Sequence, residues 1–204
     1  MALMHNIANK LTMLRFMLSF LFVAFMVFDN LYCRIFSLVV FLAAAITDLY
    51  DGKLARMQKQ ESNYGRVVDP LADKVLTVTA YVFFVKETQY FNIPAWLVSL
   101  IIIREFTVSG LRTLSLYYKT ELVTSKLGKL KTVSQFIAII TILLICIINL
   151  YFTNYTVKPL PSVMIIINKY VPITLMVITF IATWVSGLDY VLRNKKIVYD
   201  IAVK

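Results

Sequence analysis

The chain is a succession of long apolar stretches separated by short polar segments. Six of these stretches are close to the length of about 20 residues that a helix needs to cross a lipid bilayer. They cover residues 11–28, 31–47, 67–85, 93–118, 133–152 and 171–192. Their apolar residues run together and do not alternate with polar ones, which indicates helices and not the strands of a barrel. We therefore expect an all-α polytopic membrane protein with six transmembrane helices, forming a single domain over residues 1–204.

Prolines mark where some of these helices are expected to begin. Pro94 and Pro172 stand near the start of two apolar stretches. A helix tolerates proline best in its first turn, because the N–H that proline lacks has no helical partner there. Residues 153–170 contain Pro159 and Pro161 and are expected to form a loop.

The composition leads to the same class of protein. Hydrophobic residues make up 60% of the chain and charged residues only 16%, with a mean hydropathy of +0.77. A soluble fold cannot bury that much apolar surface, so an ordinary cytosolic enzyme, a secreted disulfide scaffold and a disordered chain are excluded. Cys33 and Cys146 lie in or near apolar stretches at unrelated spacing and are expected to be small buried residues.

The charge distribution indicates the partners and the orientation. Lysine and arginine total 21 against 11 acidic residues, a formal charge of +10. Most of these cations lie beside the apolar stretches, so membrane lipids and phosphate groups are the expected partners, and nucleic acid is not. They are concentrated at the two termini and in the second and fourth loops. By the positive-inside rule, these parts are expected on the cytoplasmic side.

Four aspartates lie where the second and third stretches meet. Asp48 and Asp51 end the second stretch, and Asp69 and Asp73 open the third. Spacings of three and four residues place each pair on one helix face, and a short connection would let the two faces converge. Ionised carboxylates at membrane depth are costly unless they surround cations, and oxygen ligands favour Mg²⁺ or Mn²⁺. Solvated acids at helix ends are the alternative interpretation of the aspartates alone.

Small and basic residues accompany these aspartates at fixed spacing. The segment reads Asp48-x-x-Asp51-Gly52-x-x-Ala55-Arg56, then eight residues, then Gly65-x-x-x-Asp69-x-x-x-Asp73. At each specified position this resembles the signature of the CDP-alcohol phosphotransferase family. Members of that family are six-helix membrane enzymes, commonly homodimers, in which the hydroxyl of an alcohol displaces CMP from a CDP-linked lipid or alcohol.

The resemblance implies a role for each residue of the motif. Divalent metal, usually two ions, would be held by Asp48, Asp51, Asp69 and Asp73. The CDP-diacylglycerol site would be lined by Gly52, Ala55, Arg56 and Gly65, together with Asp48. Asp73 would be the general base or would only orient the attacking hydroxyl.

The acceptor has to be inferred from a second, basic region. Glu105, Ser109 and Arg112 share a helix face by spacing, and Arg104 lies deep enough in the fourth stretch to need a partner. Residues 103–112 and 125–132 resemble bacterial members of the family that use glycerol 3-phosphate, which implies the bacterial cytoplasmic (inner) membrane. The residues expected to bind the acceptor phosphate are Arg104, Arg112, Lys126, Lys129 and Lys131. The positive-inside rule alone would also account for the lysines.

Residues 6–15 resemble the amphipathic interfacial segment that begins these enzymes, with Ala8 where the family usually has proline. The main alternative within the family is a cardiolipin synthase, whose acceptor is phosphatidylglycerol; serine and inositol phosphate are further alternatives. A cation transporter built on intramembrane aspartates is the alternative outside the family. It leaves Gly52, Arg56 and Gly65 without a role.

Overall fold

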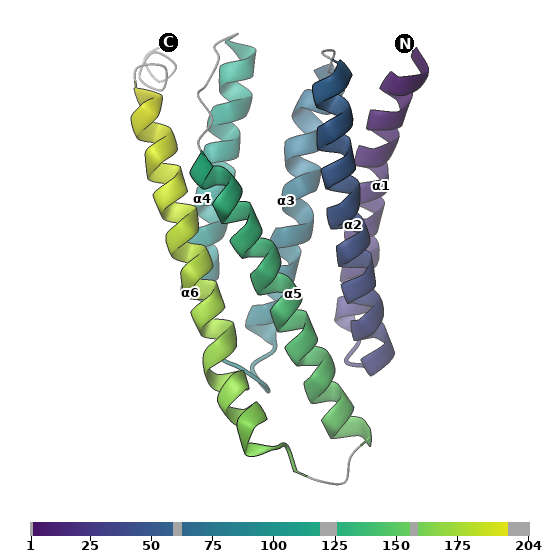
Figure 1. Cartoon of the computed structure of the whole chain (residues 1–204), viewed down its shortest axis with the longest axis vertical. Coiled ribbons are helices and arrows are strands. Elements are labelled where there is room, and N and C mark those ends of the chain that lie inside the picture. Colours follow the sequence, from purple (N-terminus) through teal and green to yellow (C-terminus); the bar gives the residue numbers. More distant parts are fainter. Residues whose placement is uncertain (1, 59–62, 119–125, 156–158, 196–204) are drawn as a thin grey trace. The chain divides into compact units, whose positions relative to one another are not determined.

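The computed structural model describes the backbone of the chain except at residues 1, 59–62, 119–125, 156–158 and 196–204. It does not describe the side chains of residues 2–12, 48–58, 63–73, 116, 117 and 126. The described residues form helices and no strands (Figure 1), as the apolar pattern predicted. In chain order, the helices are α1 (Ala2–Val27), α2 (Leu31–Gln58), α3 (Asn63–Lys86), α4 (Ala95–Tyr117), α5 (Lys126–Tyr155) and α6 (Ser162–Arg193).

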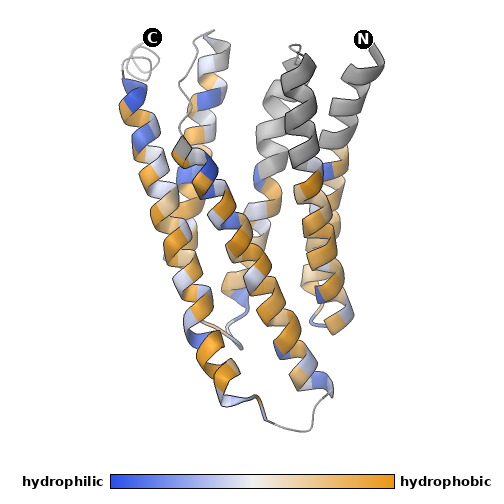
Figure 2. Ribbon diagram, viewed as in Figure 1, coloured by the Kyte–Doolittle hydropathy of each residue, from blue (hydrophilic) through white to orange (hydrophobic). Residues whose placement is uncertain are grey.

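Two of the described helices are long and apolar enough to cross a membrane, judged by length and composition. They are Leu127–Tyr155, within α5, and Ser162–Arg193, which is α6. Figure 2 shows hydrophobic residues along most of both helices, with hydrophilic residues gathered toward their ends. The apolar segments Met13–Val27 and Leu31–Thr47 are shorter. Two helices of the described part thus meet the length and composition of a membrane span, and six transmembrane helices stay a prediction.

The chain divides into two compact units. The first consists of Met1–Phe83 and Leu143–Leu160, and the second of Phe84–Ile142 and Pro161–Lys204. In the first unit α1 packs against α2, with the rings of Phe22 and Phe41 at 6.0 Å and those of Phe25 and Phe36 at 5.5 Å.

A buried arginine fixes the turn between α1 and α2. Arg34 is fully buried, and its Nη2 donates to the Asp29 carboxylate at 3.0 Å while its Nη1 donates to the Met26 carbonyl at 3.4 Å. That carbonyl belongs to the last turn of α1, where helical partners run out. Asn30 caps the start of α2 by accepting a hydrogen bond from the Tyr32 N–H at 2.9 Å. The polar pair Asp29-Asn30 therefore reverses the chain between two apolar helices.

In the second unit α4 packs against α6, and the first part of α5 contacts both. At one place Trp96 of α4 meets Phe180 of α6 edge to face, with ring centroids 6.5 Å apart. The hydroxyl of Thr179 on α6 donates a hydrogen bond to the carbonyl of Ser134 on α5 at 3.5 Å. Ile101, Ile139 and Ile142 are fully buried. This packing brings the buried polar residues described below together.

The prediction that a helix begins at Pro172 is wrong. The helix α6 begins ten residues earlier at Ser162, where the Met164 N–H bonds to the Pro161 carbonyl at 2.8 Å, and Pro172 lies inside it. A membrane helix tolerates internal proline when neighbouring helices and polar side chains satisfy the freed backbone groups. Of the loop predicted at residues 153–170, residues 162–170 belong to α6 and residues 153–155 belong to the end of α5. Pro94, in contrast, does stand directly before α4.

The amphipathic segment predicted at residues 6–15 is not a separate element. The helix α1 runs without a break from Ala2 to Val27, so this segment and the first apolar stretch form one helix. Neither Cys33 nor Cys146 forms a disulfide, and Cys146 is buried and Cys33 half-buried, as expected from their apolar surroundings.

Candidate active site

The backbone at the four motif aspartates is helical. Asp48 and Asp51 lie in α2, and Asp69 and Asp73 lie in α3. Spacings of three and four residues in a helix correspond to one turn, as the motif requires. The side chains of these aspartates lie outside the described part of the structure, as do those of Gly52, Ala55, Arg56 and Gly65. Among the side chains that are described, no group of three or more histidine, cysteine or acidic residues is placed to hold a metal ion.

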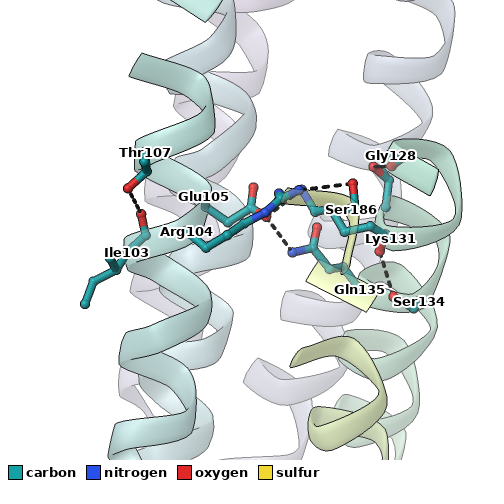
Figure 3. A network of polar contacts seen from close by, with 10 residues as sticks. Ile103, Arg104, Glu105, Thr107, Gly128, Lys131, Ser134, Gln135 and Ser186 are labelled. Carbon is teal, nitrogen blue, oxygen red and sulfur yellow. Dashed lines mark hydrogen bonds and ion pairs between the residues drawn. The ribbon is translucent and has the colours of Figure 1, made fainter. Parts of the chain in front are cut away.

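The basic region predicted to bind the acceptor contains a buried polar cluster. We call it the Arg104 network, and Figure 3 shows it between α4, α5 and α6. Its members are Arg104 and Glu105 of α4, Lys131 and Gln135 of α5, and Ser186 of α6. All five residues are at most 7% exposed. Ionic groups buried to this extent interact more strongly than they would in water.

A single carboxylate oxygen is the centre of the Arg104 network. Oε1 of Glu105 accepts from Nη1 of Arg104 at 3.0 Å, from Nζ of Lys131 at 2.6 Å and from Nε2 of Gln135 at 3.3 Å. Two of these three donors carry a full positive charge, which makes their hydrogen bonds shorter and stronger than neutral ones. The carboxylate thus holds cations from α4 and α5 together.

The arginine reaches from α4 to α6. Its Nη2 donates to Oγ of Ser186 at 3.0 Å, and its side chain passes over Gly187. A Cβ atom on that glycine would lie 2.7 Å from Nε of Arg104, closer than real Cβ contacts come. The absence of a side chain at residue 187 therefore lets the arginine lie against the α6 backbone.

Among the described ionisable groups of the Arg104 network there are two cations and one anion. Arg104 and Lys131 each carry a positive charge, and Glu105 carries one negative charge, so these three groups have a formal excess of one positive charge. Removing a charge from water is unfavourable unless an opposite charge is near. Taken by themselves, these three groups favour an anionic ligand over a cationic one.

The structure brings together two of the five residues predicted to bind the acceptor phosphate. Arg104 and Lys131 meet at Glu105. Arg112 and Lys129 are exposed, and the side chain of Lys126 lies outside the described part. Binding of phosphate by all five residues stays a prediction.

The sequence interpretation did not single out Gln135, Ser186 or Gly187. Each of them interrupts an apolar stretch, at 133–152 or 171–192, with a polar or very small residue. A polar residue within an expected membrane span is a signal of a functional or packing site. That signal was present, but it does not say which partner the residue meets.

Comparisons with known proteins all indicate the same protein family. The sequence model of the CDP-alcohol phosphatidyltransferase family matches residues 5–185. A CDP-diacylglycerol–glycerol-3-phosphate 3-phosphatidyltransferase of Cereibacter sphaeroides is 41% identical over 138 residues, which are 66% of this chain and 61% of that protein. The aligned part therefore spans less than two thirds of that relative's length. Proteins of the same name from Rickettsia typhi and Bacillus subtilis are 34% and 35% identical, over 69% of this chain and 78% of their own.

Proposed function

Because the chain belongs to the CDP-alcohol phosphatidyltransferase family, we propose that it transfers the phosphatidyl group of CDP-diacylglycerol to glycerol 3-phosphate. The observation that carries this proposal is the motif from Asp48 to Asp73, whose eight specified residues lie within the matched region. The names of the three relatives support the choice of donor and acceptor.

The reaction is a displacement at phosphorus. A hydroxyl oxygen of glycerol 3-phosphate forms a bond to the phosphorus that carries the diacylglycerol. The bond from this phosphorus to the CMP oxygen breaks, and CMP leaves with the bonding electrons. The proton of the attacking hydroxyl must be accepted, and we assign that role, or the orientation of the hydroxyl, to Asp73. A carboxylate that also binds metal is a weak base. Orienting the attacking hydroxyl would therefore be a sufficient role for Asp73.

The donor set of the motif fits divalent metal. Asp48, Asp51, Asp69 and Asp73 offer only oxygen ligands from one turn each of two helices, which is the chemistry that Mg²⁺ and Mn²⁺ prefer. We propose that these four residues hold two such ions. When bound, the ions would neutralise negative charge that builds up on the departing diphosphate oxygen. On the same helices, Arg56 would bind the diphosphate, and Gly52, Ala55 and Gly65 would leave room for the CDP group.

The Arg104 network supports an acceptor that is itself a phosphate. A phosphate group would offset the excess positive charge of Arg104, Lys131 and Glu105. Arginine and lysine are the side chains that bind phosphate oxygens best. We place the phosphate of glycerol 3-phosphate at this network, with Arg112, Lys126 and Lys129 completing the basic surroundings.

We further propose that the protein is a homodimer in a bacterial cytoplasmic membrane, with six transmembrane helices and both termini in the cytoplasm. The excess of cations at the termini and in the second and fourth loops supports this orientation. A site near the cytoplasmic side would give soluble glycerol 3-phosphate direct access.

An acceptor comparison tests the proposed function. The purified protein is supplied with CDP-diacylglycerol and Mg²⁺, and CMP release is measured with glycerol 3-phosphate, phosphatidylglycerol, serine or inositol phosphate as acceptor. We expect glycerol 3-phosphate to give the fastest release and EDTA to abolish it. Faster release with phosphatidylglycerol would make the protein a cardiolipin synthase, and CMP release that persists in EDTA would contradict the metal site.

A further inference from the structure

The glycine at residue 187 lies where the side chain of Arg104 crosses α6. A Cβ atom there would come within 2.7 Å of Nε, 3.3 Å of Cγ and 3.5 Å of Cδ of Arg104. Gly187 lies inside α6 and does not have the positive φ for which glycine is otherwise needed. Glycine also weakens a helix interior relative to alanine. The space that it leaves for Arg104 is thus the physical reason for a glycine at this position.

The two terminal nitrogens of Arg104 form hydrogen bonds with residues of two different helices. Nη1 donates to Glu105 of its own helix α4, and Nη2 donates to Ser186 of α6, both at 3.0 Å. Beside Nε lies Gly187, where a side chain would collide with the arginine. Each terminal nitrogen carries two N–H groups, so the bonds to Glu105 and Ser186 leave a second N–H on each that can meet an anion.

We propose that Ser186 and Gly187 are positioning residues that set the guanidinium of Arg104 for the acceptor phosphate. This inference rests on the proposed function, in which Arg104 contacts glycerol 3-phosphate. Ser186 and Gly187 themselves need not touch the substrate. They act through Arg104, so their substitution should change the binding of the phosphate-bearing acceptor and leave the CDP-linked donor unaffected.

The test is a kinetic comparison of Gly187→Ala with the unsubstituted protein. The added methyl group must displace Arg104, because Nε and not a free side-chain end occupies the space. We expect the KM for glycerol 3-phosphate to rise by about tenfold or more, the equivalent of one lost hydrogen bond to a charged group. The KM for CDP-diacylglycerol should stay unchanged. Ser186→Ala removes one hydrogen bond but keeps the space, so its KM should rise less.

Two glycine-to-alanine controls match this change. A Cβ at Gly110 of α4 would have no atom of the described residues within 4 Å, and one at Gly128 of α5 would lie in ordinary contact, 3.9 Å from Oγ of Ser186. Both variants should keep the KM values of the unsubstituted protein. An increase as large as that of Gly187→Ala in either control would show that the effect is general to these helices, which would overturn the inference.

A double-mutant cycle shows whether Gly187 acts through Arg104. In an Arg104→Ala background the space is already empty, so adding Gly187→Ala should raise the KM for glycerol 3-phosphate no further. If Gly187→Ala raises the KM for glycerol 3-phosphate equally with and without Arg104, or raises it in neither case, the inference is overturned. If Gly187→Ala does not fold, the same cycle with Ser186→Ala decides. Failure of the proposed function is visible separately, because the unsubstituted protein would then release no CMP with glycerol 3-phosphate.

Discussion

Replacing Glu105 with glutamine should destabilise the protein more than any other single change in the Arg104 network. The substitution keeps the shape of the side chain and an oxygen that can accept hydrogen bonds. It removes the negative charge of Glu105, whose Oε1 lies 3.0 Å from Nη1 of Arg104 and 2.6 Å from Nζ of Lys131. The formal excess of positive charge on these three residues then rises from one to two.

The size of the effect follows from these contacts. The hydrogen bonds from Arg104 and Lys131 stay charge-assisted through their donors, but each loses the opposite charge on its acceptor. Removing one charge from a buried ion pair in this way costs about 3–5 kcal/mol. At about 2–4 °C per kcal/mol for a chain of this size, the thermal midpoint should fall by about 6–20 °C.

Lys131→Met provides an internal comparison. It also removes one of the two ion pairs at Oε1, but it leaves Arg104 and Glu105 as a balanced pair at 3.0 Å. Its loss of stability should therefore be smaller than that of Glu105→Gln. A variant outside the network, Asp189→Asn, removes the charge from an ion pair in which the Arg193 side chain is 55% exposed and the Asp189 side chain 21% exposed. Because water screens the arginine of this pair, the control should shift the midpoint less than the two network variants.

The assay is thermal unfolding of the purified protein in one detergent, followed by helical signal, with all three variants measured side by side. The expected order of destabilisation is Glu105→Gln, then Lys131→Met, then Asp189→Asn. If Glu105→Gln lowers the midpoint no more than Asp189→Asn, the carboxylate does not hold the network together. If Lys131→Met is the most destabilising variant, the excess positive charge does not determine the stability of the network.

Three further predictions concern the substrates. Asp69→Asn should lower CMP release by at least about 100-fold at saturating Mg²⁺, because the metal ions lose a charged ligand; near-normal release would contradict the metal site. Arg56→Lys should raise the KM for CDP-diacylglycerol, because lysine keeps the charge but not the two-pronged geometry; an unchanged KM would show that Arg56 does not bind the diphosphate. Arg112→Ala should weaken glycerol 3-phosphate by about 1.5 kcal/mol, the lower end for a charged hydrogen bond, because Arg112 is exposed. An equal loss of CDP-diacylglycerol affinity would contradict a role confined to the acceptor.

The helices could be predicted from the sequence because apolar composition over about 20 residues leaves few alternatives in a membrane. The start of α6 was missed because a rule for soluble helices was applied to Pro172. In a soluble helix an internal proline costs about 3 kcal/mol or more. In the second unit Pro172 is buried, and α6 continues through it from Ser162.

The two groups of candidate site residues differ in how far they could be predicted. The motif from Asp48 to Asp73 depends on spacing within two consecutive helices, which the sequence itself displays. The Arg104 network depends on contacts between residues 30 positions apart, at Gln135 and Glu105, and 82 apart, at Arg104 and Ser186. The cost of burying Arg104 predicted that a partner exists. Only the packing of α4 against α6 identifies Ser186 and Gly187.

The partners of Arg104 are explained by the free energy that burying this arginine would cost without them. On insertion scales an arginine at the centre of a membrane helix is unfavourable by about 2.5–3.5 kcal/mol. A methionine or leucine there would avoid that cost and fill the same volume. Arg104 instead forms hydrogen bonds with Glu105 on its own helix and with Ser186 on α6. It also lies next to Gly187, which has no side chain to collide with it. A charge that is held this firmly, in a cluster with more cations than anions, is suited to meet an anion that is absent from the chain itself, and the phosphate of glycerol 3-phosphate has that chemistry.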